Sequence, residues 1–423
     1  MTEIITYEGN LTGKKYKPGI DFKFVLSVPD VGERELALMI EHDGPNIANI
    51  NSMRTLADKG LAPYCACIGV RPGIMYMSDG SPRGMRMNSY DLFDREYGDF
   101  LVYELIPFIA EKYSVRFSAS PDMHALSGGS SGGISAFTVA WFHPEYFHRV
   151  YISSPSFLAM GRGNEIPYLI RKYETKPLKI AFECSEKEPN DYFGAILPID
   201  DEARAALEFS RYDFRYTFFP GEGHCSRYRN EQTAYERNEW LWRGWQDECV
   251  RAPGNSPRVD RIIPNGSSWD VCDTFPKKDA ESSPIKASEH GLLVQSNDGL
   301  AWYAASVDDD CIYMITDPER SGDSKLLHAT LHTVARCYPK GAIDMDVDKT
   351  DRLFVLTSIG IQCVRSFGLI DAILDLPDDS APLALAVTDA LYVRTERGVY
   401  RRTLCPECVT ESESKRAYTS YYD

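Results

Sequence analysis

The segment that most constrains the fold of this chain is a run of serines and glycines at residues 126–133, Leu-Ser-Gly-Gly-Ser-Ser-Gly-Gly. It follows a strand-like apolar run and opens a helix-like apolar run. In the pattern Gly128-x-Ser130-x-Gly132, the turn is too tight for large flanking side chains, and the serine is left exposed at the edge of a sheet. The helix N-terminus beneath it presents free N–H groups and a positive dipole end to a developing oxyanion. The sequence therefore predicts a nucleophilic serine on a strand-turn-helix element.

Two registers fit this motif. Ser131 also lies between two glycines, Gly129 and Gly133. We prefer Ser130, because the N–H of Ser131 then falls at the helix start, where it can hold an oxyanion.

The second oxyanion donor is expected in the loop after the early strand at residues 35–41. That loop reads His-Asp-Gly-Pro-Asn at residues 42–46. Because Pro45 has no N–H, the donor is either Gly44 or Asn46, and Gly44 is our first choice.

A serine nucleophile needs a base, and His224 is the best-placed histidine. It ends the stretch Pro-Gly-Glu-Gly-His at residues 220–224, just after a strand that we expect to end at Phe219. A glycine-rich loop at a late strand end is a suitable place for the base. The other candidates are interpreted as strand histidines that precede the nucleophile or as surface caps at a helix end: His42, His124, His143 and His148.

The acid of a triad is expected between the serine and the histidine, at another strand end. The predicted strand at residues 178–183 leads into Cys-Ser-Glu-Lys-Glu-Pro-Asn-Asp at residues 184–191. We choose Glu188, and Glu186 and Asp191 remain alternatives. The acid would fix the tautomer of the catalytic histidine and stabilise the imidazolium.

Strand-like and helix-like runs alternate through the first part of the chain. This order predicts an α/β fold with a mostly parallel sheet covered by helices on both faces. The expected strands are 22–28, 35–41, 65–70, 123–126, 150–153, 178–183 and 214–219, and the expected helices include 100–113, 131–142, 200–209 and 235–245.

A stretch rich in proline, glycine and serine at residues 251–257 marks a domain boundary. We expect a hydrolase-like domain at 1–250, a linker at 251–264, an all-β domain at 265–409 and a polar tail at 410–423. Three similar segments, 292–315, 342–364 and 383–401, predict about three blades of a partial β-propeller. Three blades cannot close a ring and would leave two apolar blade faces open. Three arrangements would cover these faces: packing of the first domain on them, folding of the segment as a small sandwich, or pairing of two chains about a two-fold axis. We expect the third, a homodimer formed through this C-terminal region.

Composition narrows the function classes. The formal net charge of −16 repels phosphate backbones and anionic lipids, so neither nucleic acid nor a membrane is an expected partner.

The N-terminus lacks the features of a signal peptide, which predicts a cytoplasmic protein. The 11 cysteines include one CxxC pair, Cys405 and Cys408, without a second pair to complete a zinc site. We expect no metal and no organic cofactor.

Several motifs together make residues 15–245 resemble esterases of the enterochelin-esterase and feruloyl- or acetyl-xylan-esterase type, within the α/β-hydrolases. The resemblance implies Ser130 as nucleophile and His224 as base, with Glu188 where many members have aspartate. It also places Arg86 and Arg162 along the active-site cleft, although structural ion pairs are an equally good interpretation of both. The matching segments are 41–44, 86–91, 128–137, 143–147, 154–157, 212–213 and 221–224.

The C-terminal part resembles the end of a gluconolactonase-type propeller, most clearly at residues 346–362. Where that family carries metal-binding asparagine and aspartate, this chain has His290 and Ile343, and the neighbouring Asp344 fits only with a register shift. Isoleucine cannot replace an oxygen ligand. We therefore predict no lactonase site.

These observations favour a serine esterase acting on small molecules, such as acetylated or hydroxycinnamoylated sugars. The first alternative is hydrolysis of a siderophore trilactone with the same residues. A second alternative, from a different class, is a non-catalytic scaffold with a decayed hydrolase domain.

Overall fold

The computed structural model describes residues 1–246, 250, 254–276, 292–296, 299–305, 310–315, 325–331 and 341–405. The chain forms two compact units. The first comprises Met1–Leu169 and Lys176–Pro253, and the second comprises Ile170–Thr175 and Gly254–Asp423. The second unit thus contains a short piece, Ile170–Thr175, from the middle of the sequence of the first.

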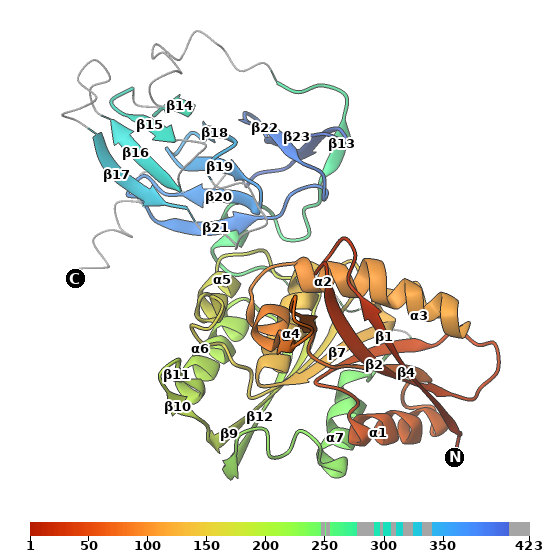
Figure 1. Cartoon of the computed structure of the whole chain (residues 1–423). Helices are drawn as coiled ribbons and strands as arrows, with labels where there is room; N and C mark the ends of the chain where they lie inside the picture. Colours follow the sequence, from red (N-terminus) through yellow and green to blue (C-terminus); the bar gives the residue numbers. More distant parts are fainter. Residues whose placement is uncertain are drawn as a thin grey trace. The chain divides into compact units, whose positions relative to one another are not determined.

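The first unit is built on a 10-stranded sheet of order β12-β9-β8-β7-β3-β4-β2-β5-β6, with β1 paired to β2 (Figure 1). The six strands from β12 to β4 are parallel, and the remaining pairs are antiparallel. The bounds are β1 Ile4–Thr12, β2 Ile20–Pro29, β3 Ala37–His42, β4 Cys65–Val70, β5 Ile74–Tyr76, β6 Pro82–Gly84, β7 His124–Gly129, β8 Arg149–Ser153, β9 Lys179–Lys187 and β12 Asp213–Gly223.

Helices cover both faces of this sheet (Figure 1), which confirms the expected α/β-hydrolase architecture. Helix α4 is apolar along its length, and 11 of its 12 residues are buried, as expected for a helix enclosed on all sides. Helices α1 and α7 lie side by side. The bounds are α1 Ile47–Asp58, α2 Glu96–Phe100, α3 Ile106–Tyr113, α4 Ser131–Phe142, α5 Ile166–Ile170, α6 Ile196–Phe209 and α7 Glu231–Leu241.

Some elements differ in detail from the sequence pattern. Helix α1 occupies the stretch between the expected strands 35–41 and 65–70, and Asn46 caps it by accepting hydrogen bonds from the N–H groups of Ala48 and Asn49. The last helix ends at Leu241, not Trp245. A short hairpin, β10 (Asn190–Asp191) and β11 (Gly194–Ala195), also follows β9.

Parallel pairing brings four strand ends to one edge of the sheet. Gly129 at the end of β7 is in register with Ser153 at the end of β8. Gly223 at the end of β12 is in register with Lys187 at the end of β9. Ligand sites in open parallel sheets lie beyond the carboxyl ends of the strands, so this edge is the candidate site.

The second unit contains three four-stranded antiparallel sheets among its described residues, ordered β14-β15-β16-β17, β18-β19-β20-β21 and β13-β24-β23-β22. Their number equals the expected number of blades, and a propeller-type arrangement stays a prediction. The bounds are β13 Asp270–Cys272, β14 Leu292–Gln295, β15 Trp302–Ala305, β16 Cys311–Ile315, β17 Lys325–Thr330, β18 Asp344–Val347, β19 Leu353–Thr357, β20 Gly360–Val364, β21 Ile370–Leu374, β22 Pro382–Val387, β23 Leu391–Thr395 and β24 Val399–Arg402.

Residues 254–264 of the expected linker belong to this second unit. Val259, Ile262 and Ile263 are fully buried in its apolar core. The inserted piece, Ile170–Thr175, is held by Glu174, which accepts hydrogen bonds from Arg402 at 2.6 and 2.8 Å. A single cut near residue 250 would therefore not separate the two units.

The residues considered for a lactonase metal have structural roles or lie outside the described residues. Ile343 packs against the apolar core of the second unit. Asp344 accepts hydrogen bonds from the N–H groups of Met345 at 2.9 Å and Leu385 at 2.8 Å, which links β18 to β22. His290 lies outside the described residues, and so does Cys408 of the CxxC pair considered for zinc. In the described ranges no group of three or more His, Cys, Asp or Glu residues is arranged to hold a metal ion.

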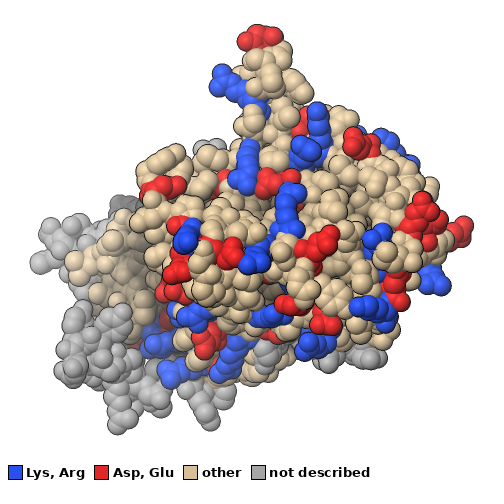
Figure 2. Space-filling model, turned by 90° about the horizontal axis from the view of Figure 1, so that it is seen from below, with Lys and Arg blue, Asp and Glu red and all other residues tan. Residues whose placement is uncertain are grey.

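Two further observations concern the whole described chain. None of its helices is long and apolar enough to cross a lipid bilayer. On the face shown in Figure 2, acidic and basic side chains are interspersed, without a broad patch of one sign.

Candidate active site

Ser130 lies in the tight turn between β7 and α4, with φ of 57° and ψ of −126°. This backbone conformation is strained for any residue with a side chain and is typical of functional sites. Glycine at position 128 is a steric requirement, because a Cβ there would lie 2.0 Å from the carbonyl oxygen of Gly132. A Cβ at Gly132 would lie 3.0 Å from Cβ of His42, which is a tight contact. The structure thus explains the glycines of the sequence motif.

The two expected oxyanion donors differ in availability. Ser131 is the first residue of α4, so its N–H has no acceptor within the helix. The N–H of Gly44 instead donates to the carbonyl oxygen of Val70 at 2.9 Å. The neighbouring N–H of Asp43 donates to the hydroxyl of Tyr90 at 3.2 Å. The choice of Gly44 therefore has to be corrected, because pairing with the end of β4 occupies this donor.

Of the three candidate carboxylates, Glu188 is the one that contacts His224 in the described structure. Its Oε2 lies 2.5 Å from Nδ1 of His224. Glu186 instead accepts a hydrogen bond from the N–H of Gly221 at 2.5 Å, and Asp191 accepts from the N–H of Phe193 at 2.9 Å. The loops after β9 and β12 thus bring together two residues that are 36 positions apart.

The local environment of this pair favours its charged states. Burial opposes ionisation of Glu188, but hydrogen bonds with His224 and Ser154 outweigh it and lower the pKa of the carboxyl. Burial likewise opposes a charged imidazole, but interactions with Cys225 and Glu188 outweigh it and raise the pKa of His224. Glu188 can therefore stabilise an imidazolium formed during a reaction.

The hydroxyl of Ser130 pairs with Ser156 and not with His224 in this structure. The two Oγ atoms lie 3.2 Å apart, and the N–H of Ser156 donates to the carbonyl oxygen of Ser130 at 3.1 Å. Catalytic hydrogen bonds are often incomplete before substrate binds. A rotation about the Cα–Cβ bond of Ser130 would release its hydroxyl from Ser156.

Both arginines expected along the cleft form ion pairs. Arg86 makes a two-point contact with the carboxylate of Asp43, at 3.0 and 2.8 Å, and Arg162 makes one with Glu165, at 2.8 and 2.7 Å. Their side chains keep 40% and 36% of their surface exposed. The ion-pair interpretation is therefore observed, and contact with substrate stays a prediction.

Sequence reasoning assigned no role to three residues that lie near the proposed catalytic and oxyanion groups. Ser154 and Ser156 flank Pro155 in the turn after β8, and each contacts a candidate catalytic residue. Asp91 is buried near Ser131. Burial raises the pKa of Asp91 to about 6, against the opposing effects of Ser131 and Arg86. All three were within segments that carried the family resemblance, but a sequence motif does not reveal which side chains meet.

The other histidines of the first unit have structural contacts. His42 and His124 are buried with ring nitrogens bonded to backbone carbonyl oxygens. Burial lowers the pKa of His42 to about 4, so its ring is neutral. His143, expected at the surface, is fully buried and contacts Asp99 and Glu145. That expectation was wrong because the ring of His143 lies against Gly98 of α2 and pairs with Asp99.

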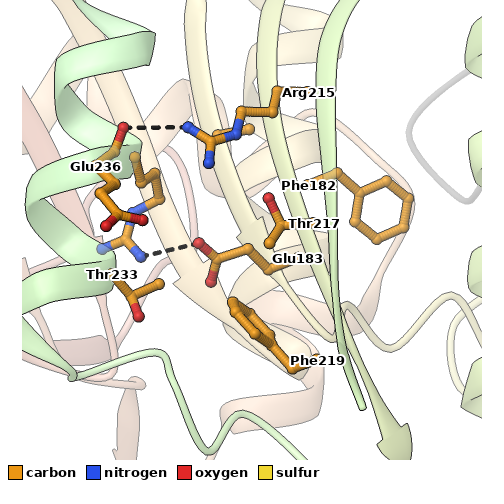
Figure 3. A pocket seen from close by; sticks show the side chains of 9 residues that line it. Phe182, Glu183, Arg215, Thr217, Phe219, Thr233 and Glu236 are labelled. Atoms are coloured by element: carbon orange, nitrogen blue, oxygen red, sulfur yellow. Dashed lines mark hydrogen bonds and ion pairs between the residues drawn. The ribbon is translucent and has the colours of Figure 1, made fainter.

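A cavity of about 40 Å³ lies between α7 and strands β9 and β12 (Figure 3). Glu183 there pairs with Arg237 at 3.2 Å, and Arg215 donates to the backbone carbonyl of Glu236 at 3.2 Å. This volume suits a water molecule or two and is far below that of a substrate site. Its lining includes none of the proposed catalytic residues.

The family model described as "Putative esterase" matches residues 24–272. No curated protein matches the chain. Among solved structures, a ferulic acid esterase is 16% identical with a TM-score of 0.44, and the match covers 57% of this chain and 98% of that one.

Two further solved structures are similar at the same level. The siderophore hydrolase EstB from Aspergillus nidulans is 15% identical with a TM-score of 0.43, covering 58% of this chain and 96% of that one. The enterobactin esterase FES from Shigella flexneri is 16% identical with a TM-score of 0.42, covering 56% of this chain and only 59% of that one. Because the family model matches more than half of the sequence, the chain belongs to the Esterase family and is a carboxylesterase-type hydrolase.

Proposed function

We propose that the protein hydrolyses carboxylic esters of small molecules through Ser130, His224 and Glu188. Nε2 of His224 takes the hydroxyl proton while Oγ of Ser130 attacks the ester carbonyl, and the N–H of Ser131 holds the oxyanion. Glu188 keeps the other imidazole proton on Nδ1 and stabilises the imidazolium. His224 then passes the proton to the leaving alcohol, and a water molecule releases the acid by the same steps.

One observation carries this proposal. Glu188 contacts Nδ1 of His224 at 2.5 Å at the same sheet edge that presents Ser130 on its strained turn. The nucleophile, the acid and the base come in that order along the chain, as expected for this fold. In the resting structure the hydroxyl of Ser130 contacts Ser156, so it has to leave this contact before attack.

For the substrate, we propose acylated sugars carrying acetyl or hydroxycinnamoyl groups, on the strength of the sequence resemblance described above. The alternative is a siderophore trilactone, whose ester bonds need the same chemistry. Arg86 and Arg162 would line the cleft, and both keep partly exposed guanidinium groups that can turn toward a polar substrate. A panel of p-nitrophenyl esters with acetyl to aromatic acyl groups would distinguish small from large acyl pockets.

Labelling with a fluorophosphonate tests the chemistry itself. The wild-type chain should gain one adduct by intact mass, and Ser130→Ala should gain none. Ser131→Ala serves as the matched control and should still be labelled. Labelling that survives in Ser130→Ala but not in Ser131→Ala would move the nucleophile to the other register. An unlabelled wild-type chain without esterase activity would instead support a scaffold.

The cellular setting is also a proposal. We propose a cytoplasmic enzyme, because the eight cysteines in the described ranges are free thiols. We also propose that it uses no metal or organic cofactor, because a Ser-His-Glu mechanism needs neither. We further propose that two chains pair through partial propellers in their C-terminal units. Cell fractionation tests the location, and light scattering tests the pairing of chains.

A further inference from the structure

Three loops of the proposed active site meet at Ser154. This residue follows β8 and is fully buried. Its Oγ donates to Oε1 of Glu188 at 2.6 Å and accepts from the N–H of Cys225 at 3.3 Å. Its own N–H donates to the carbonyl oxygen of Glu183 at 2.7 Å. One side chain therefore joins the loop of the acid to the residue directly after His224.

The backbone at Ser154 has a positive φ of 44°. A side chain in this conformation costs about 1–2 kcal/mol relative to glycine, which adopts it without strain. If the chain needed only this turn, glycine would be the better residue. Compared with glycine, serine at this strained position adds only a hydroxyl group. The hydrogen bonds of that hydroxyl are therefore the feature that offsets the strain.

The hydrogen bond from Ser154 determines which carboxylate oxygen of Glu188 faces His224. Oε1 of Glu188 accepts from Ser154 and from the N–H of Ser185 at 2.9 Å, so only Oε2 is left for His224. A carboxylate held at one oxygen by two donors cannot rotate without losing both bonds. Charge-assisted bonds of this kind are stronger than neutral ones and also lower the pKa of Glu188.

We propose that Ser154 is a positioning residue of the active site: its hydroxyl orients Glu188 and, through the N–H of Cys225, the loop that carries His224. This inference rests on the proposed function, because it assigns Ser154 a role through Glu188 and His224. It involves no direct contact with substrate.

The test compares Ser154→Ala and Ser154→Gly in the full-length chain. Both remove the hydroxyl, but only glycine also relieves the positive φ. If Ser154 positions Glu188, both variants lose kcat by about tenfold or more, while KM stays within about twofold. Ser154→Thr keeps a hydroxyl and should recover part of the lost kcat.

The pH profile gives a readout that a purely structural role would not move. Contact with Glu188 helps to raise the pKa of His224. If loss of the Ser154 hydroxyl lets Glu188 turn away, that contact weakens and the pKa of His224 falls. The acid limb of kcat/KM should therefore move to lower pH in both variants.

Ser114 provides a matched control. It is exposed and has a φ of 53° at the end of α3, outside the proposed active site. Ser114→Gly relieves the same kind of strain and should leave kcat and the pH profile unchanged. Full kcat in Ser154→Gly, a loss confined to KM, or failure of both Ser154 variants to fold would overturn the positioning role. Activity that survives Ser130→Ala would instead reject the proposed function itself.

Discussion

Replacing Glu188 by glutamine is the most informative perturbation, because the hydrogen bonds around the carboxylate determine how the new amide turns. Oε1 accepts from Ser154 and from the N–H of Ser185, and Oε2 faces Nδ1 of His224. A backbone N–H can only donate, so the amide oxygen stays beside Ser185. The amide N–H₂ group must then face His224.

This orientation inverts the tautomer of the imidazole. Facing an N–H₂ donor, Nδ1 of His224 accepts, and the ring proton moves to Nε2. An imidazole protonated at Nε2 cannot take the proton of Ser130. The equivalent change in serine proteases lowers kcat about 10⁴-fold, which corresponds to about 5 kcal/mol of transition-state stabilisation. We expect a similar loss in Glu188→Gln, with KM little changed because no substrate contact is removed.

Steady-state hydrolysis of p-nitrophenyl acetate, with circular dichroism to verify folding, measures this effect. Glu186→Gln is the matched control, since Glu186 bonds to the N–H of Gly221 and not to the base. The control should keep nearly full activity. If folded Glu188→Gln retains more than about a tenth of wild-type kcat, or if Glu186→Gln loses as much, the tautomer argument is wrong.

Because the pKa of His224 is raised, kcat/KM should increase with pH through an apparent pKa above the ordinary value of about 6.5; a plateau that persists below pH 6 would contradict this. Gly128→Ala should destabilise the first unit by about 1–3 kcal/mol or more in denaturant unfolding, because its Cβ would overlap the carbonyl oxygen of Gly132. Asp344→Ala should lower the stability of the second unit by about 1–3 kcal/mol, since the N–H of Leu385 loses its acceptor; an unchanged thermal midpoint would refute that link. Light scattering of the full chain should give the mass of a dimer, and a monomer at micromolar concentration would reject pairing of the second units.

The sequence by itself determined the features that depend on local sterics and periodicity. The glycines around Ser130 specify a tight turn, and in the structure that turn leaves no room for a side chain at Gly128. Alternating apolar runs specify which segments become strands and helices, because the hydrophobic period differs between the two. The family resemblance rested on the same local segments.

Only the tertiary structure decided which groups meet at the sheet edge. Glu186, Glu188 and Asp191 lie within six residues of one another, and local sequence does not distinguish the one that contacts His224. Gly44 is a reasonable oxyanion donor by sequence, but in the structure its N–H donates to the carbonyl oxygen of Val70 at the end of β4. The contacts of Ser154 join segments 34 and 71 positions apart. Such hydrogen bonds depend on strand register and loop path, which arise from packing of the whole sheet and have no period in the sequence.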